Sequence, residues 1–238
     1  MTDPAPSATA DFRPLPTVLS GAIALVAAAV AAGLIAETAA QRTVLAVALV
    51  GVAAVAVGGR LWRLDHAVFG VVMALCGTLV VAVAVGEALS RPETVVGRLE
   101  LLPAVLGLWT LAAALVPVRF GRRRLLVDAG AALVFLAVVT SGVVRGASTP
   151  ALVGAGAATI LAWDAAENAV SIGGQVGSDP GTATARAELV HAGAGGGLAV
   201  GAVAAVLGVS RLGIDGLPFA ALLALLVAGV ALALVAHG

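Results

Sequence analysis

The chain has 238 residues, of which 61% are hydrophobic and 11% are charged, and its formal net charge is zero. Soluble domains carry about 45–50% apolar and about 25% charged residues, so a soluble fold would lack the polar surface to cover this core. The composition excludes a soluble globular protein, and the absence of a large basic block argues against nucleic-acid binding. We therefore expect an integral protein of the cell membrane, with the lipid bilayer as its surroundings.

Apolar runs follow one another along the chain after a short polar start. Residues 1–16 are rich in proline and are expected to form a disordered tail, followed by a single transmembrane domain over 17–238. A spanning helix needs about 20 mainly apolar residues. The first four runs of this kind cover residues 17–36, 43–59, 67–89 and 101–118. Pro103 is expected in the first turn of the fourth helix, where a missing N–H is tolerated.

The second half of the chain supplies four more runs. They cover residues 125–144, 150–173, 184–209 and 218–236. Thr149 and Pro150 suit the N-cap and first turn of the sixth helix, and residues 178–182 have turn chemistry. The sequence thus predicts an all-α fold, a polytopic membrane helix bundle of about eight transmembrane helices joined by short loops.

The arginines indicate how the bundle is oriented, because short cytoplasmic loops carry an excess of basic residues. With eight spans, eight of the thirteen arginines fall on one side and five on the other. The cluster Arg119–Arg124 supplies most of this difference. Both termini are therefore predicted to be cytoplasmic.

A polar stripe interrupts the sixth run. Asp164, Asn168, Ser171 and Gln175 follow an i, i+4, i+7, i+11 pattern, with Glu167 beside them. Asp164 lies about 21 Å from the predicted helix start, and a carboxylate near the bilayer centre costs roughly 2.5–3.5 kcal/mol. The stripe is interpreted either as a proton relay, cation site or partner-docking point, or as packing residues hydrogen-bonded to neighbouring helices and to Arg186.

The next helix begins with a second polar group, Arg186, Glu188 and His191. A hairpin of the two helices would bring His191 near the depth of Asp164 or Glu167, and we expect it to pair with an acid there. Carboxylates and imidazole can also bind zinc or iron, but the spacing matches no metal motif. The sequence therefore predicts no metal site, no cofactor and no catalytic residues, and it marks Asp164, Glu167, Asn168, Arg186, Glu188 and His191 as a candidate functional cluster.

Three glycines on the seventh predicted helix share one face. Gly193, Gly197 and Gly201 form a GxxxGxxxG pattern, which lets helix backbones approach closely in lipid. The pattern favours packing within the chain, against the sixth or the eighth helix, over a dimer face.

The sequence of the predicted hairpin also resembles that of a known protein family. The segment Trp163-Asp164-x-x-Glu167-Asn168, with Gly174-Gln175-Val176-Gly177 and the later Glu188-Leu189-Val190-His191, resembles an uncharacterised family of multi-pass membrane proteins of halophilic archaea. The genes of that family tend to lie near those of MoxR-type AAA ATPases and von Willebrand factor A-like proteins. The resemblance implies a membrane partner or anchor for such a complex.

Two functions follow as expectations. The first is a non-enzymatic scaffold or accessory subunit of a membrane-associated complex, whose stripe and hairpin contact a cytoplasmic or membrane protein partner. The second is a small proton- or ion-coupled transporter that uses Asp164, Glu167 and His191. A transporter needs a polar path across the bilayer, for which Thr78 and Thr110 are nearly the only candidates in the first five helices.

Overall fold

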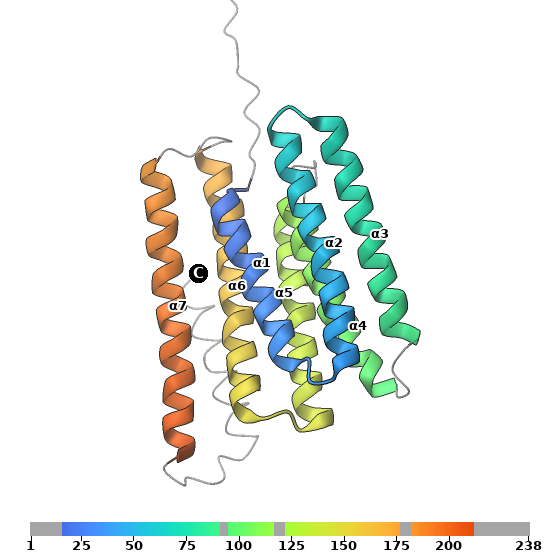
Figure 1. The fold of residues 1–238 in the computed structure, drawn as a ribbon. Helices are drawn as coiled ribbons and strands as arrows, with labels where there is room; N and C mark the ends of the chain where they lie inside the picture. Colours follow the sequence, from blue (N-terminus) through green and yellow to red (C-terminus); the bar gives the residue numbers. More distant parts are fainter. Residues whose placement is uncertain (1–15, 91–94, 117–121, 177–181, 212–238) are drawn as a thin grey trace, which may run out of the picture.

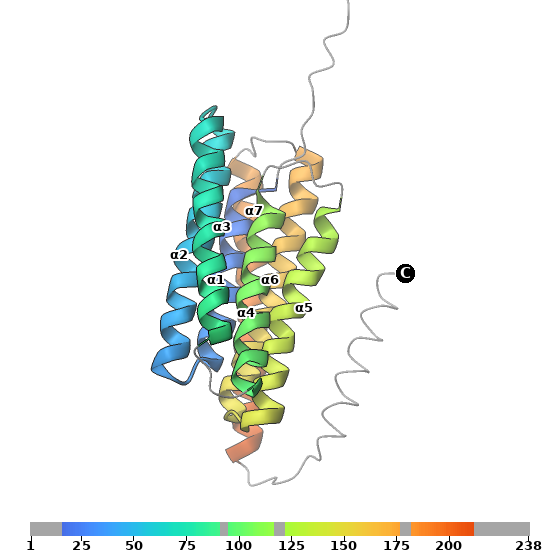
Figure 2. The same ribbon diagram turned by 90° about the vertical axis from the view of Figure 1, so that its right-hand side faces the viewer.

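The computed structural model describes residues 16–90, 95–116, 122–176 and 182–211. Every regular element in these ranges is a helix, and the helices run roughly parallel to one another in one bundle (Figures 1 and 2). They are α1 (Val18–Ile35), α2 (Ala39–Arg63), α3 (Ala67–Ser90), α4 (Val95–Leu115), α5 (Arg123–Thr140) with the π-helix η1 (Ser141–Arg145), α6 (Thr149–Val176) and α7 (Thr182–Arg211). The all-α prediction is confirmed for these residues.

α2 and α4 differ most from their predicted bounds. α2 begins earlier than residue 43 because Thr38 and Gln41 form a capping box at its start. It ends at Arg63, before a tight turn in which Asp65 has a φ of 61°. α4 begins at Val95, so Pro103 lies inside the helix and not in its first turn as predicted.

Four described helices are long and apolar enough to cross a membrane. They are α1, α2, α3 and the continuous helix that α5 and η1 form over Arg123–Arg145. α4 contributes a shorter apolar stretch, Leu101–Leu115, while α6 and α7 have 28 and 30 residues but are not among the four. The structure agrees with a polytopic membrane bundle. Eight spans remain a prediction, because the eighth run, 218–236, lies outside the described residues.

Successive helices run in alternating directions, which gathers many arginines at one end of the bundle (Figure 1). Arg63 at the end of α2 contacts the carbonyls of Pro16, just before α1, and of Leu115, at the end of α4. We call this the arginine end; among the described residues it holds Arg60, Arg63, Arg122, Arg123, Arg124 and Arg186. It is the end that the charge asymmetry predicts to be cytoplasmic.

Alanines form the contact between the first helix and the sixth. α1 packs mainly against α6, and both helices present small residues at helical spacing. The fully buried alanines of the two helices are Ala24, Ala28, Ala31, Ala155, Ala162, Ala166 and Ala169. Helices with such short side chains can approach closely, so dispersion contacts between backbones replace the large apolar side chains of a soluble core.

Glycines allow α2 and α3 to approach even more closely. A Cβ atom added to Gly77 would lie 2.5 Å from the carbonyl oxygen of Gly51, and one added to Gly58 would lie 2.6 Å from that of Gly70. Real Cβ atoms do not come this near to a carbonyl oxygen. The two backbones are therefore in direct contact at two levels, about two helical turns apart.

The pair α4–α5 repeats this arrangement. A Cβ atom on Gly107 would lie 2.7 Å from the carbonyl oxygen of Gly130. The strongest contacts between helices that follow one another in the chain thus occur in α2–α3 and α4–α5, and each depends on glycine.

The outer face of α3 is apolar and exposed. Its side chains with more than half of their surface exposed are Val68, Phe69, Val72, Leu75, Leu79 and Val83. A continuous apolar surface of this kind is unusual on soluble monomers. In a bilayer the same side chains contact lipid acyl chains, which agrees with the composition.

We predict that Gly77→Ala destabilises the bundle and that Gly86→Ala does not. Both glycines lie in α3, but a Cβ atom on Gly86 has no described neighbour within 4 Å. Overpacking at Gly77 should cost about 1–3 kcal/mol, whereas alanine at Gly86 improves helix propensity. Thermal unfolding of the detergent-solubilised variants measures the difference. Equal unfolding temperatures for the two variants would contradict the close α2–α3 contact.

Candidate functional site

The polar residues of α6 and α7 lie where these two neighbouring helices pack against each other: Asp164 lies 12 residues before the end of α6, and Glu188 and His191 lie 6 and 9 residues after the start of α7. They do not form one cluster. Asp164 and Glu188 contact different partners, and Glu167 faces α5 instead of α7. The stripe therefore divides into three contacts, each of which joins α6 or α7 to another helix.

The first contact is a buried carboxylate at the start of α1. Glu188 of α7 is only 1% exposed. Its Oε2 accepts hydrogen bonds from the Thr17 hydroxyl at 3.0 Å, the Ser20 hydroxyl at 2.7 Å and the Ser20 backbone N–H at 3.0 Å. These donors lie 171 and 168 residues away in the chain.

The chemistry of a helix N-terminus explains this arrangement. The first N–H groups of a helix have no partner within it, and the helix dipole favours a negative charge there. Thr17 is the N-cap of α1, but its side chain makes no capping hydrogen bond. Glu188 from α7 takes that role and accepts the N–H of Ser20. A buried carboxylate with three donors is satisfied without a cation.

α6 completes this contact from its other side. The Asn168 amide donates to the Ser20 hydroxyl at 3.4 Å, and that hydroxyl donates in turn to Glu188. The backbone N–H of Thr17 donates to the carbonyl of Ala169 at 2.9 Å. The start of α1 is thus held by both helices of the α6–α7 hairpin.

The second contact is the pair Asp164 and His191. The predicted pairing of His191 with an acid across the hairpin is present, with 2.9 Å between its Nε2 and Asp164 Oδ2. An ionised carboxylate only accepts hydrogen bonds, so Nε2 carries the proton. The side chains are 44% and 52% exposed. This pair therefore lies on the outside of the bundle and not around an interior path.

The third contact joins α6 to α5. Glu167 Oε2 lies 3.7 Å from Arg124 Nε, while Glu167 Oε1 is buried without a hydrogen-bond partner. One turn before it, the Trp163 indole donates to Asp128 at 2.9 Å. Glu167 and Asp164 thus point to opposite neighbours of α6.

Arg63 connects the end of α2 to the start of α1 and to the end of α4. Its guanidinium donates to the carbonyl of Pro16 at 2.5 Å and to the carbonyl of Leu115 at 3.1 Å. Leu115 is the last residue of α4, where helix carbonyls lack partners. Arginine suits this position because its rigid fork of donors reaches two acceptors at once.

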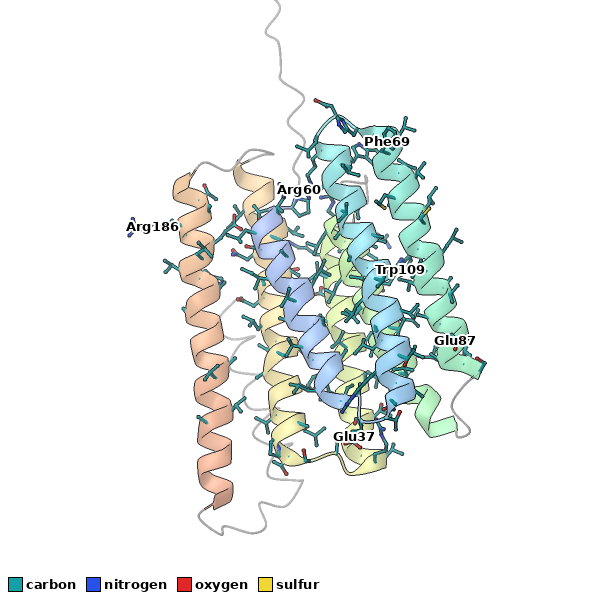
Figure 3. All side chains as sticks on the ribbon, in the orientation of Figure 1. Glu37, Arg60, Phe69, Glu87, Trp109 and Arg186 are labelled. Carbon is teal, nitrogen blue, oxygen red and sulfur yellow. The ribbon has the colours of Figure 1, made fainter. Side chains whose placement is uncertain are left out.

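Sequence reasoning identified only part of these contacts. Arg186 is exposed and has no partner among the described residues (Figure 3), so the suggested contact between Arg186 and the acids of α6 is absent there. The side chain of Gln175 lies outside the described residues. The partners that the sequence did not identify are Thr17, Ser20, Arg63, Arg124 and Asp128. Thr17 and Ser20 carry an N-cap signal, but nothing local shows that a distant carboxylate completes it.

The possible metal site is not formed by the described side chains. Glu188 is engaged with α1, while Asp164 and His191 form a separate pair. Among the described residues, no three His, Cys, Asp or Glu side chains gather in a way that could hold an ion.

The glycine face of α7 does not contact α6. Cβ atoms on Gly193, Gly197 and Gly201 would meet no described atom within 4 Å. Gly195 faces α6 instead, where an added Cβ atom would lie 3.2 Å from Leu161. The expected packing of the three glycines against the sixth helix is therefore not observed, and the eighth predicted helix lies outside the described residues.

Comparison with known proteins adds a family without an assigned activity. A family model described as a family of unknown function, DUF7519, matches residues 93–233. No curated protein and no solved structure matches the chain. The matched range includes Asp164, Glu188 and His191 but not the α1 residues that Glu188 caps.

We predict that Glu188→Ala destabilises the protein more than Glu188→Gln does. Alanine leaves the Ser20 N–H and two hydroxyl groups without their acceptor, at a cost of roughly 2–3 kcal/mol. Glutamine keeps an acceptor oxygen and loses only the charge at the helix terminus. Thermal unfolding in detergent measures both effects, and Arg186→Gln, an exposed change on the same helix, serves as the control. Unfolding of Glu188→Ala at the wild-type temperature would show that the contact does not hold α1.

Proposed function

We propose that this chain, which belongs to the DUF7519 family, is a non-enzymatic scaffold or accessory subunit of a membrane-associated complex. In this proposal the α6–α7 hairpin is the surface that contacts the partner. The partner is a membrane protein or a cytoplasmic protein, and the resemblance of the hairpin suggests an AAA ATPase-type complex.

The observation that carries the proposal is the exposure of the Asp164–His191 pair. The pair lies 12 residues before the end of α6, about 18 Å along the helix. The neighbouring side chains Leu189 and Val190 are 57% and 66% exposed. A half-exposed, hydrogen-bonded pair of ionisable side chains beside apolar ones is poorly matched to lipid. A partner with polar groups at this level would cover it.

The other members of the candidate cluster, apart from Arg186, are already engaged within the bundle, which leaves the Asp164–His191 pair as the contact surface in this proposal. Glu188 and Asn168 are engaged in holding α1, and Glu167 faces Arg124. Of the acids and the histidine in the candidate cluster, Asp164 and His191 are therefore the ones that remain accessible from outside the bundle. Arg186 adds an exposed cation nearer the start of the same helix.

The transporter alternative receives less support from the described residues. The hydroxyls of Thr78 and Thr110 donate to carbonyls of their own helices, at Ala74 and Leu106. The indole of Trp109, 3.5 Å from Thr78, adds only a local contact. Neither threonine extends a polar path toward Asp164.

We predict that Asp164→Ala abolishes co-purification of a partner from native membranes. The removed carboxylate leaves His191 without its acceptor on the contact surface. Asp128→Ala is the matched control, because Asp128 is also exposed and hydrogen-bonded between helices, but on the α5 side. Tagged protein is purified in mild detergent, and bound proteins are quantified by mass spectrometry.

Two outcomes would overturn the proposal. In the first, Asp164→Ala and Asp128→Ala retain the same proteins as the wild type, although all three elute as folded particles. In the second, proteoliposomes take up protons or ions at a rate that Asp164→Asn abolishes, which would assign transport to this site.

A further inference from the structure

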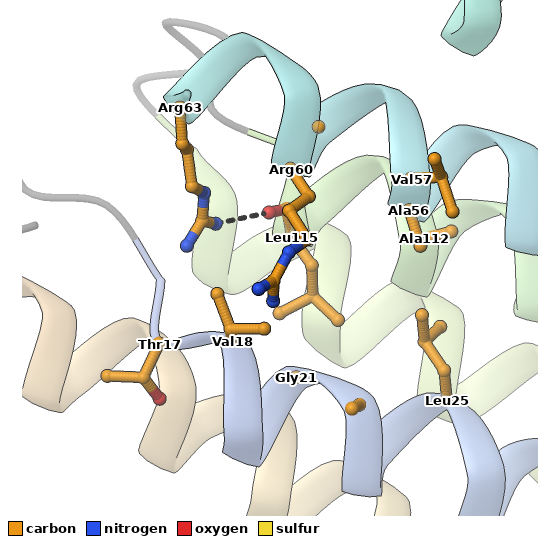
Figure 4. Close-up of a pocket in the computed structure, with 12 residues that line it drawn as sticks. Thr17, Val18, Gly21, Leu25, Ala56, Val57, Arg60, Arg63, Ala112 and Leu115 are labelled. Atoms are coloured by element: carbon orange, nitrogen blue, oxygen red, sulfur yellow. Dashed lines mark hydrogen bonds between the residues drawn. The ribbon is translucent and has the colours of Figure 1, made fainter. Parts of the chain in front are cut away.

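A cleft opens between α1, α2 and α4 at the arginine end (Figure 4). Its volume is about 190 Å³. It does not involve α6 or α7 and is therefore separate from the Asp164–His191 pair. α1 and α2 are joined at the opposite end of the bundle, and few contacts link them elsewhere.

The wall of the cleft is apolar. Small side chains in the wall leave the cleft open. Gly21 lies on the α1 side, where an added Cβ atom would be 3.5 Å from Leu115. Other wall residues are Ala22, Leu25, Ala56, Val57 and Ala112. A wall of this composition accepts a hydrocarbon chain, because it offers dispersion contacts and little that a chain would have to desolvate.

Two arginines lie at the mouth of the cleft. Arg60 is exposed and has no partner among the described residues, and Figure 4 shows its guanidinium directed toward Val18 of α1. Arg63 donates to two carbonyls, but its Nε is buried without an acceptor. No acidic side chain is among the described residues that line the cleft.

This combination of features indicates an anionic ligand. Two guanidinium groups that lie close together without an acid repel each other, and an anion between them removes that repulsion. Guanidinium groups match phosphate geometry through paired N–H donors. The apolar wall below them continues in the direction of the helix axes, as an acyl chain would.

We propose that this cleft binds one anionic phospholipid. The phosphate contacts the exposed guanidinium of Arg60 at the mouth of the cleft, close to the positive charge of Arg63, and one acyl chain lies against Leu25, Val57 and Ala112. The second chain remains in the bilayer, which the open side of the cleft permits. Bound in this way, the lipid fills the space between α1 and α2 and neutralises the charge at the end of α2.

The test is native mass spectrometry of the full chain in detergent with added lipid. Phosphatidylglycerol should bind as a single molecule and more tightly than phosphatidylcholine with the same acyl chains. Arg60→Gln should weaken phosphatidylglycerol binding about fivefold, the effect of one arginine near a lipid headgroup. Ala22→Phe should weaken binding of the same lipid by filling the cleft. Arg122→Gln is the control, because Arg122 is exposed at the same end but does not line the cleft.

Four results would overturn the proposal. Equal binding of the two lipids would remove the role of charge, and equal losses for Arg60→Gln and Arg122→Gln would indicate general surface attraction. Displacement of phosphatidylglycerol by millimolar inorganic phosphate would assign the cleft to a free anion. Arg60→Gln should also leave the unfolding temperature of the lipid-free protein unchanged. If Arg60→Gln instead lowers this unfolding temperature, and the double variant Asp3→Asn/Asp11→Asn lowers it equally, the N-terminal residues and not a lipid would be assigned to the cleft.

Discussion

Polar side chains within an apolar helix bundle need partners on neighbouring helices, and the arrangement at the arginine end follows from this constraint. Glu188 is its clearest case, because a buried carboxylate is stable here only with the three donors that the start of α1 provides. The same contact satisfies an N–H group of α1 that has no partner within its own helix. One interaction thus fixes the position of α1 against α7, and Asn168 extends it to α6.

Small residues are the second requirement, because they let the helices come close enough for such contacts. Alanine lines the α1–α6 contact, and glycine lines the contacts in α2–α3 and α4–α5. α7 differs from these helices. Its glycines at 193, 197 and 201 have no described neighbour, and it packs against α6 through Gly195. The helix that carries Glu188 therefore presents a glycine face without a neighbour among the described residues.

The two proposed surfaces lie on different sides of α1 and use charge differently. Asp164 and His191 hydrogen-bond to each other and stay half-exposed, which suits a protein partner with its own polar groups. Arg60 and Arg63 have no acidic neighbour in the cleft, which suits an anion. The cleft opens at the arginine end, whereas the Asp164–His191 pair lies nearer the middle of α6, and α1, anchored by Glu188, separates the two. A membrane scaffold with a lipid bound between α1 and α2, attached to a partner through its hairpin, would use both.

The sequence by itself determined the class of protein, the helical fold and the positions of the main helices, because composition and the length of apolar runs depend only on local chemistry. It also located the polar hairpin and the pairing of His191 with an acid, since both follow from adjacent helices. The tertiary structure decided which helix each polar residue meets. Glu188 caps α1 across 168 residues, and Glu167 contacts Arg124 while Asp164 contacts His191. The periodicity of a helix shows which residues share a face, but the order in which the helices pack decides what lies opposite that face.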